Sequence, residues 1–250
     1  MKNVIIGFLL ILVLSNTTLA NQNKEIQDAL KSIANKYQSH QSISYQVLYK
    51  IKLLMSKDVE QVQSDVELIR KENDNNFGSI IWYKLGDTVE KYYSGIELFI
   101  INHKTKTITT FNLSAGEIDG IIQDIDGDVV RIPFANPKMI IGLNDGLNKL
   151  SIKKHPKDKN LKQILIKFPN EKSFENAEME ITYKLNTFDI VKIFSKFKFR
   201  GELQTNEWNL SNIQFNTVTE TDLSKRFAKF KSYKRVKFQK PKHQILDQNN

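Results

Sequence analysis

The chain has 250 residues, a formal net charge of +9 and no cysteine. The missing cysteine excludes disulfides, thiolate metal sites, cysteine nucleophiles and the acylated cysteine that anchors bacterial lipoproteins. Nine cations and no acidic residue lie between Lys225 and Lys242, so the rest of the chain is close to neutral.

The N-terminus has the pattern of a secretory signal peptide. Lys2 precedes an uncharged, mostly aliphatic run from Val4 to Leu14, and small residues follow up to Ala20. The apolar run is about half of the roughly 20 residues that a transmembrane helix requires. We therefore expect residues 1–20 to be removed on export. Residues 21–250 are expected to form one soluble domain in the periplasm.

The next segments predict a helix and then a long series of strands. Apolar residues recur at helical spacing from Lys24 to Tyr37. From Ile43 to Leu53 they alternate with mostly polar residues, which is typical of a strand. Comparable segments between tight turns predict strands at 62–71, 79–85, 88–93, 97–103, 106–112, 161–168, 178–185, 189–200 and 207–216. Such close spacing predicts an α+β fold, mostly β, with a largely antiparallel sheet.

Helices are predicted at three further places. One short helix is expected at 115–122, and a second begins at the cap Asn136 with Pro137 in its first turn and runs toward Leu150. Near the end of the chain, Thr221 is the predicted cap of a helix that precedes a last, basic strand.

Several predicted strands are apolar on both faces. Leu98 and Phe99 are consecutive and face opposite sides, and farther along Ile190 and Phe194 are predicted on the face opposite Ile193. A sheet with one solvated face alternates more cleanly. The second apolar face must therefore pack on another layer or line a cavity. A barrel with a filled core and a ligand cavity both remain open.

Two segments resemble the LolA family of periplasmic lipoprotein carriers. The run Tyr92–Phe111 is similar to a strand hairpin of that family, and Pro133-Phe134-Ala135-Asn136-Pro137 is similar to the segment before its central helix. The resemblance is closest to LolA-like domains that precede thioredoxin-like domains in some exported bacterial proteins, where a run like Tyr37–Tyr49 opens the domain. It implies a highly curved antiparallel sheet, an incomplete barrel, with helices packed in or over its concave face. The hollow of such a barrel shelters acyl chains.

The sequence departs from the family where the cargo is bound. Bacterial carriers of the family use an arginine of a strand together with aromatic residues. The first long strand here carries Lys50 and Lys52 instead, and Arg70 comes in the next strand. The resemblance therefore does not identify the cargo.

The sequence lacks a complete motif for metal binding or catalysis. The run Asp124–Asp128 is similar to the start of a calcium loop, but Val129 and Ala135 stand where an EF-hand needs glycine and glutamate, which favours a surface turn. No histidine falls in a metal-ligand spacing, because the four are far apart, at His40, His103, His155 and His243. No nucleophile elbow or phosphate-binding glycine loop occurs. We expect no metal, no cofactor and no enzymatic activity.

The basic segment Lys225–Lys242 is interleaved with aromatic residues. That pattern suits a nucleic-acid backbone with stacked bases, but an exported protein does not meet that partner. Anionic lipid head groups are the better functional interpretation. A solvated helix and edge strand, whose charges block edge-to-edge aggregation, remains equally open.

These observations favour a periplasmic carrier of the cell envelope that shelters lipoprotein acyl chains or another lipid. The predicted lining of its cavity is Tyr45, Val47, Tyr49, Trp82, Phe99, Ile101 and Phe194, with Met139 and Ile140 as an adaptable lid. The expected partners are the acyl chains, an anionic membrane surface and an envelope protein. The alternative is a non-catalytic protein-interaction module with a filled core, and a hydrolase would need a polar site that the sequence does not show.

Overall fold

The computed structural model describes residues 22–74, 76–112, 129–130, 132–171 and 174–238, and its strands form one curved sheet. The order in the sheet is β12-β6-β5-β4-β3-β2-β1-β11-β10-β9-β8-β7. Neighbours are antiparallel except β12 and β6, which are parallel. The strands are β1 Ser42–Lys52, β2 Glu60–Arg70, β3 Ser79–Leu85, β4 Val89–Tyr93, β5 Glu97–Asn102, β6 Thr107–Asn112, β7 Lys149–Lys154, β8 Leu161–Lys167, β9 Phe174–Lys184, β10 Ile190–Phe199, β11 Glu202–Phe215 and β12 Lys234–Lys237.

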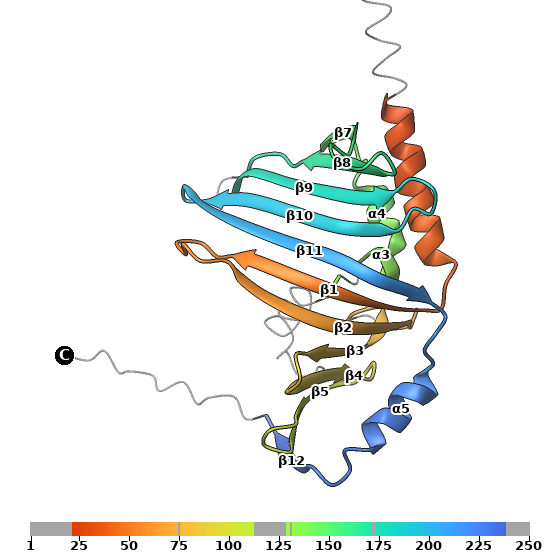
Figure 1. The fold of residues 1–250 in the computed structure, drawn as a ribbon, viewed down its shortest axis with the longest axis vertical. Coiled ribbons are helices and arrows are strands. Elements are labelled where there is room, and N and C mark those ends of the chain that lie inside the picture. Colours follow the sequence, from red (N-terminus) through yellow and green to blue (C-terminus); the bar gives the residue numbers. More distant parts are fainter. Residues whose placement is uncertain (1–21, 75, 113–128, 131, 172–173, 239–250) are drawn as a thin grey trace, which may run out of the picture.

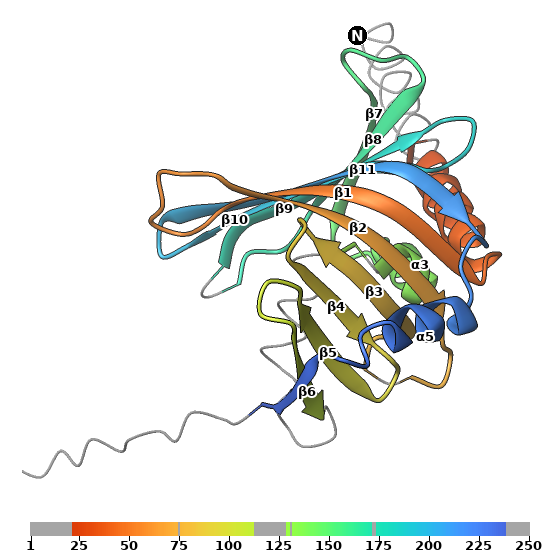
Figure 2. The same cartoon turned by 60° about the horizontal axis from the view of Figure 1, so that its bottom comes forward.

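The sheet bends strongly but does not close, and β12 and β7 remain its two edges (Figures 1 and 2). This is the incomplete barrel that the sequence predicted, so the fold class is confirmed. The predicted strands are also present, although β9 and β11 begin four and five residues earlier than expected.

One prediction in the middle of the chain was wrong. The helix expected from Pro137 to Leu150 is the short α4, Pro137–Gly142, and the unpredicted edge strand β7 follows it. A turn ends the helix, because Gly146 has φ +85° and the Asp145 carboxylate accepts the backbone N–H of Leu147 at 2.9 Å.

The N-terminal helix, residues 22–38, packs on the concave face of the sheet together with α3, Ile132–Ala135, and α4 (Figure 2). Its residues Ile26, Leu30 and Ile33 are almost completely buried in the larger core, as their helical spacing predicted. The remaining helix, α5, Glu220–Ala228, covers the opposite face and builds a second, smaller core there. Each face of the sheet thus carries a helical layer over part of its width. The strands there are apolar on both faces because both faces are covered.

The cap of α5 is Thr219 and not Thr221. The Thr219 hydroxyl accepts the backbone N–H of Asp222 at 3.2 Å, and the Asp222 carboxylate accepts the backbone N–H of Thr219 at 3.0 Å. This reciprocal pair is a capping box, which needs an acidic or amide side chain three residues after the cap. Thr219 has Asp222 at that position, whereas Thr221 has Ser224.

Three predicted segments lie outside the described residues. They are the signal peptide at 1–20, the helix at 115–122 and the acidic run at 124–128. Among the described residues, none of the helices combines the length and apolar character needed to cross a membrane.

Candidate functional site

Val129, Val130, α3 and α4 form a short cover over the concave face. Polar contacts fix this cover to the sheet. The Tyr45 hydroxyl of β1 donates a hydrogen bond to the Val130 carbonyl at 3.1 Å. Burial raises the pKa of this hydroxyl far above its ordinary value, so it remains a donor. At the end of β2, the Arg70 guanidinium donates to the Tyr37 carbonyl at 2.7 Å and lies 4.8 Å from the centre of the Phe134 ring. Arg70 thus joins the end of the N-terminal helix to α3.

A cavity of about 320 Å³ lies between this cover and the strands β9, β10 and β11. All eleven lining residues that the structure describes are apolar, namely Val129, Val130, Pro133, Met139, Ile140, Leu143, Phe168, Met179, Ile181, Ile193 and Trp208. Met139 is half exposed, at 51%, so it stands at the mouth of the cavity. The volume is at the lower end of the roughly 300–1,000 Å³ of ligand pockets.

Three lining residues on the sheet side of the cavity belong to one row of register partners, which Tyr49 continues beyond the cavity. Ile181, Ile193, Trp208 and Tyr49 are successive register partners in β9, β10, β11 and β1. Tyr49 stacks on Trp208, with ring centres 5.2 Å apart, and donates its hydroxyl to the Asn206 side chain at 2.9 Å. Trp208 is therefore held in place from the side away from the cavity.

Five of the predicted lining residues lie on this concave side. Met139 and Ile140 line the cavity itself. Tyr45 and Val47 are buried in the larger core, and Tyr49 lies behind Trp208. The structure thus places the predicted lid residues at the cavity and the β1 residues beside it.

Trp82, Phe99 and Ile101 lie on the opposite face and are not brought to the cavity. They pack beneath α5, where the Phe99 and Phe227 ring centres are 4.5 Å apart. The strand of Phe99 and Ile101 was predicted correctly as apolar on both faces. The second face proved to be a packed layer under a helix.

Phe194 also faces away from the cavity, because a bulge reverses the expected faces of β10. The register shifts between Ile190 and Lys192, so Ile190 and Ile193 both enter the larger core. Phe194 is the register partner of Glu207, one residue before Trp208. The predicted grouping of Ile190 with Phe194 was wrong for this reason.

Sequence reasoning missed most of the sheet side of the cavity, including Phe168, Met179, Ile181, Ile193 and Trp208. Met179 and Ile181 do alternate with polar residues in β9, which indicates a buried face. What places them at the cavity is the packing of α3 and α4 over β9, β10 and β11, a contact between parts of the chain that are far apart in sequence. No local pattern carries that information.

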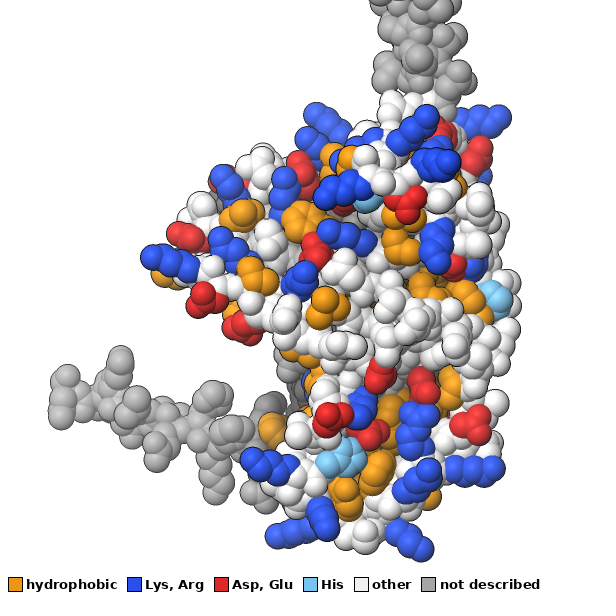
Figure 3. Space-filling model, viewed as in Figure 1, with side chains coloured by type: hydrophobic (Ala, Val, Ile, Leu, Met, Phe, Trp, Pro, Cys, Tyr) orange, Lys and Arg blue, Asp and Glu red, His pale blue; other side chains and the backbone are white. Residues whose placement is uncertain are grey.

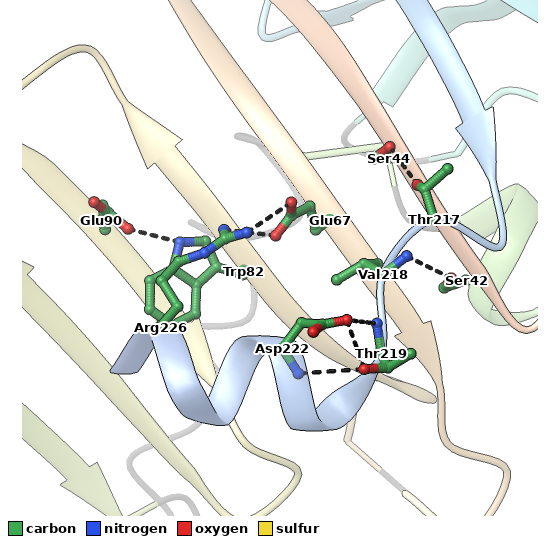
Figure 4. A network of polar contacts seen from close by, with 10 residues as sticks. All are labelled: Ser42, Ser44, Glu67, Trp82, Glu90, Thr217, Val218, Thr219, Asp222 and Arg226. Carbon is green, nitrogen blue, oxygen red and sulfur yellow. Dashed lines mark hydrogen bonds and ion pairs between the residues drawn. The ribbon is translucent and has the colours of Figure 1, made fainter. Parts of the chain in front are cut away.

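The other face carries a polar groove of about 450 Å³ beside α5. Arg226 of α5 makes two hydrogen bonds to Glu67, at 2.6 and 2.9 Å, and lies 5.0 Å from the Trp82 ring (Figure 4). The Trp82 indole N–H donates to Glu90 at 2.7 Å, and Glu90 also contacts His103 at 2.9 Å. These polar groups satisfy one another and fix α5 to the sheet. Within the described part of the chain, no cluster of acidic residues and histidines is placed to hold a metal ion.

No protein-family model and no curated protein matches this chain. Solved structures that are similar include an uncharacterized conserved protein from Thermus thermophilus, with 10% identity, a TM-score of 0.44, and coverage of 85% of this chain and 98% of that one. LprF from Mycobacterium bovis has 12% identity, a TM-score of 0.45, and coverage of 78% and 95%. A LolA superfamily protein from Nitrosomonas europaea has 8% identity, a TM-score of 0.33, and coverage of 78% and 95%. These likenesses say nothing of function. The open curved sheet with helices on its concave face agrees with the architecture that the sequence resemblance implied.

Proposed function

We propose that this protein binds one acyl chain, or an apolar ligand of similar width, in the cavity under α3 and α4. The observation that carries the proposal is the apolar lining of all eleven described residues around about 320 Å³. Each buried methylene contributes about 0.8 kcal/mol, so even a short chain gains substantial affinity. Met139 at the mouth suits such a ligand because a thioether side chain adapts to irregular shapes.

The volume favours a single chain. A water molecule occupies about 30 Å³ in the liquid. If a methylene group takes a similar volume, the cavity of about 320 Å³ accommodates roughly ten carbons. A lipid with two or more chains needs a multiple of that volume. We therefore place one chain of a fatty acid, a lipid or a lipoprotein in the cavity and leave the remainder of the ligand outside.

The proposed role is that of a non-catalytic carrier in the periplasm, in keeping with the signal peptide expected at residues 1–20. None of the described lining residues has a titratable or nucleophilic side chain. The cavity therefore offers binding and exclusion of water, without a group for acid–base or covalent chemistry.

Copurification with lipid tests this proposal. Protein isolated from its native compartment is examined by native mass spectrometry, and bound lipid is identified after organic extraction. We expect lipid on the wild-type protein and on Ile141→Lys, and its loss from Met139→Lys. Ile141 is the matched control, since it is also exposed on α4, at 36%, but does not line the cavity. Lipid-free wild-type protein that also refuses added acyl ligands contradicts the proposal.

A protein-interaction module is the second candidate, favoured by exposed apolar residues at one end of the long strands. Leu53, Met55 and Val59, in the turn between β1 and β2, are 42%, 84% and 58% exposed. Leu203 of β11 lies at the same end, because Lys52 and Thr205 are register partners. Large exposed apolar groups of this kind mark protein contacts. A Met55→Lys variant that loses an envelope partner while Met139→Lys keeps it would favour this second function.

A further inference from the structure

A cationic surface covers the end of the sheet at β12. Three segments meet there, because β12 pairs with β6 and the Lys234 N–H donates to the Lys106 carbonyl at 3.0 Å. The cationic surface consists of exposed side chains from the β5–β6 turn, from the connection after α5 and from β12, namely Lys104, Lys106, Lys229, Lys231, Lys234, Arg235 and Lys237. Figure 3 shows Lys and Arg side chains along the lower edge of the molecule, where these segments lie.

Carboxylates do not compensate these charges within the described part of the chain, although the Arg235 guanidinium lies 4.9 Å from the centre of the Phe227 ring. Within the described residues, none of the seven forms an ion pair with a carboxylate. Some cations elsewhere on the sheet are paired: Lys50 and Lys192 both contact Glu207, at 3.6 and 2.7 Å. Among the described residues, the cationic surface therefore presents positive charge to the solvent without a carboxylate partner.

Aromatic residues of the same segment make internal contacts, and the partly exposed Phe238 stacks on Phe111 with ring centres 4.6 Å apart. Phe227 contacts Phe99, and the Tyr233 hydroxyl lies 3.1 Å from His103 Nδ1. These contacts occupy ring faces on which nucleic-acid bases would otherwise stack. The apolar side chains that do face outward, Val236 and Phe238, are each 39% exposed and stand next to the cations of β12. Apolar side chains flanked by Lys and Arg suit the boundary between lipid head groups and acyl chains.

We propose that the cationic surface docks this protein on an anionic lipid bilayer. Clusters of roughly four to eight Lys or Arg residues beside a membrane are typical of binding to anionic lipids. The attraction decays over a Debye length, about 8 Å at physiological ionic strength, so the docking is reversible and sensitive to salt. It does not depend on a ligand in the cavity.

The test is sedimentation of the whole protein with vesicles made of equal parts phosphatidylglycerol and phosphatidylcholine. Each cation near the surface contributes about fivefold to the partition coefficient, so Lys229→Gln with Lys231→Gln should lower it about 25-fold. The matched control is Lys24→Gln with Lys31→Gln, which removes two exposed lysines from the N-terminal helix. We expect the control variant to bind like the wild type. Added salt should release both the wild type and the control variant from the vesicles.

Several outcomes would overturn the proposal. They are equal binding to vesicles of phosphatidylcholine alone, an equal loss in the control variant, or tighter binding to a single-stranded oligonucleotide than to the anionic vesicles. Met139→Lys separates docking from entry of an acyl chain into the cavity. Retained vesicle binding by that variant supports docking through the cationic surface, and its loss shows that the cavity is responsible.

Discussion

Tyr45 is the residue that links the first strand most directly to the cover of the cavity. Its hydroxyl donates to the Val130 carbonyl at 3.1 Å, and Val130 lines the cavity. Tyr45→Phe leaves a partly buried carbonyl without this donor, so we expect a loss of about 1 kcal/mol in the free energy of unfolding. Urea denaturation measures that loss, and the affinity for an acyl ligand should fall with it.

Tyr233→Phe is the control for this change. It removes a hydroxyl that contacts His103 on the opposite face, far from the cavity lining. It should leave the ligand affinity unchanged. Equal effects of both variants on ligand binding would show that the Tyr45–Val130 hydrogen bond does not support the cavity.

At the scale of single elements, α5 depends on its capping box. Thr219→Ala removes the acceptor of the Asp222 N–H and should lower the free energy of unfolding by about 1 kcal/mol. Thr221→Ala changes the same residue type within the first turn but not the cap. Urea denaturation should therefore show little change for Thr221→Ala, whereas a larger effect there would contradict the assignment of the cap.

A second prediction concerns the strands β8, β9 and β10, which are crossed by an ion-pair ladder. Glu178 contacts Lys196 at 2.9 Å and Lys167 at 3.3 Å, and these hydrogen bonds, that of Lys196 foremost, hold its pKa below the ordinary 4.5. Because the folded pKa is the lower one, this stabilisation is present above the ordinary pKa. It is lost as the pH falls through the folded-state value.

We therefore expect the urea midpoint of the wild type to fall more than that of Glu178→Gln between about pH 6 and about pH 3. Glu175→Gln is the control, since Glu175 is exposed and has no ion-pair partner among the described residues. It should follow the wild type. Identical pH profiles for the wild type and Glu178→Gln would show that the ladder contributes nothing measurable.

How much of each element followed from the sequence depends on its local pattern. The alternation in β1 and the helical spacing of residues 22–38 are strong, so both were predicted almost to their ends. The short edge strand β7 has only two apolar residues, Leu150 and Ile152, and was mistaken for the continuation of a helix. In β10 a bulge puts Ile190 and Phe194 on opposite faces, and a bulge leaves no mark in an alternating pattern.

At the scale of the whole molecule, the sheet separates two kinds of surface. The concave face holds the apolar cavity, and the other face holds the packed layer under α5, which Arg226 and Glu67 fix in place. The sequence predicted that the sheet has two apolar faces. It did not predict which residues lie at the cavity and which lie under α5, because that depends on which strands pair. Of the predicted lining, Met139 and Ile140 lie at the cavity since they belong to the local segment that covers it.

Titration of the delipidated protein with fatty acids of increasing length is the most direct test of acyl-chain binding in the cavity. Native mass spectrometry counts the ligands and their affinities are measured in parallel. We expect one ligand per chain, an affinity that rises about fourfold per methylene up to roughly ten carbons, and a plateau beyond that length. An affinity that does not depend on chain length, or one that Met139→Lys leaves unchanged, would contradict binding in this cavity.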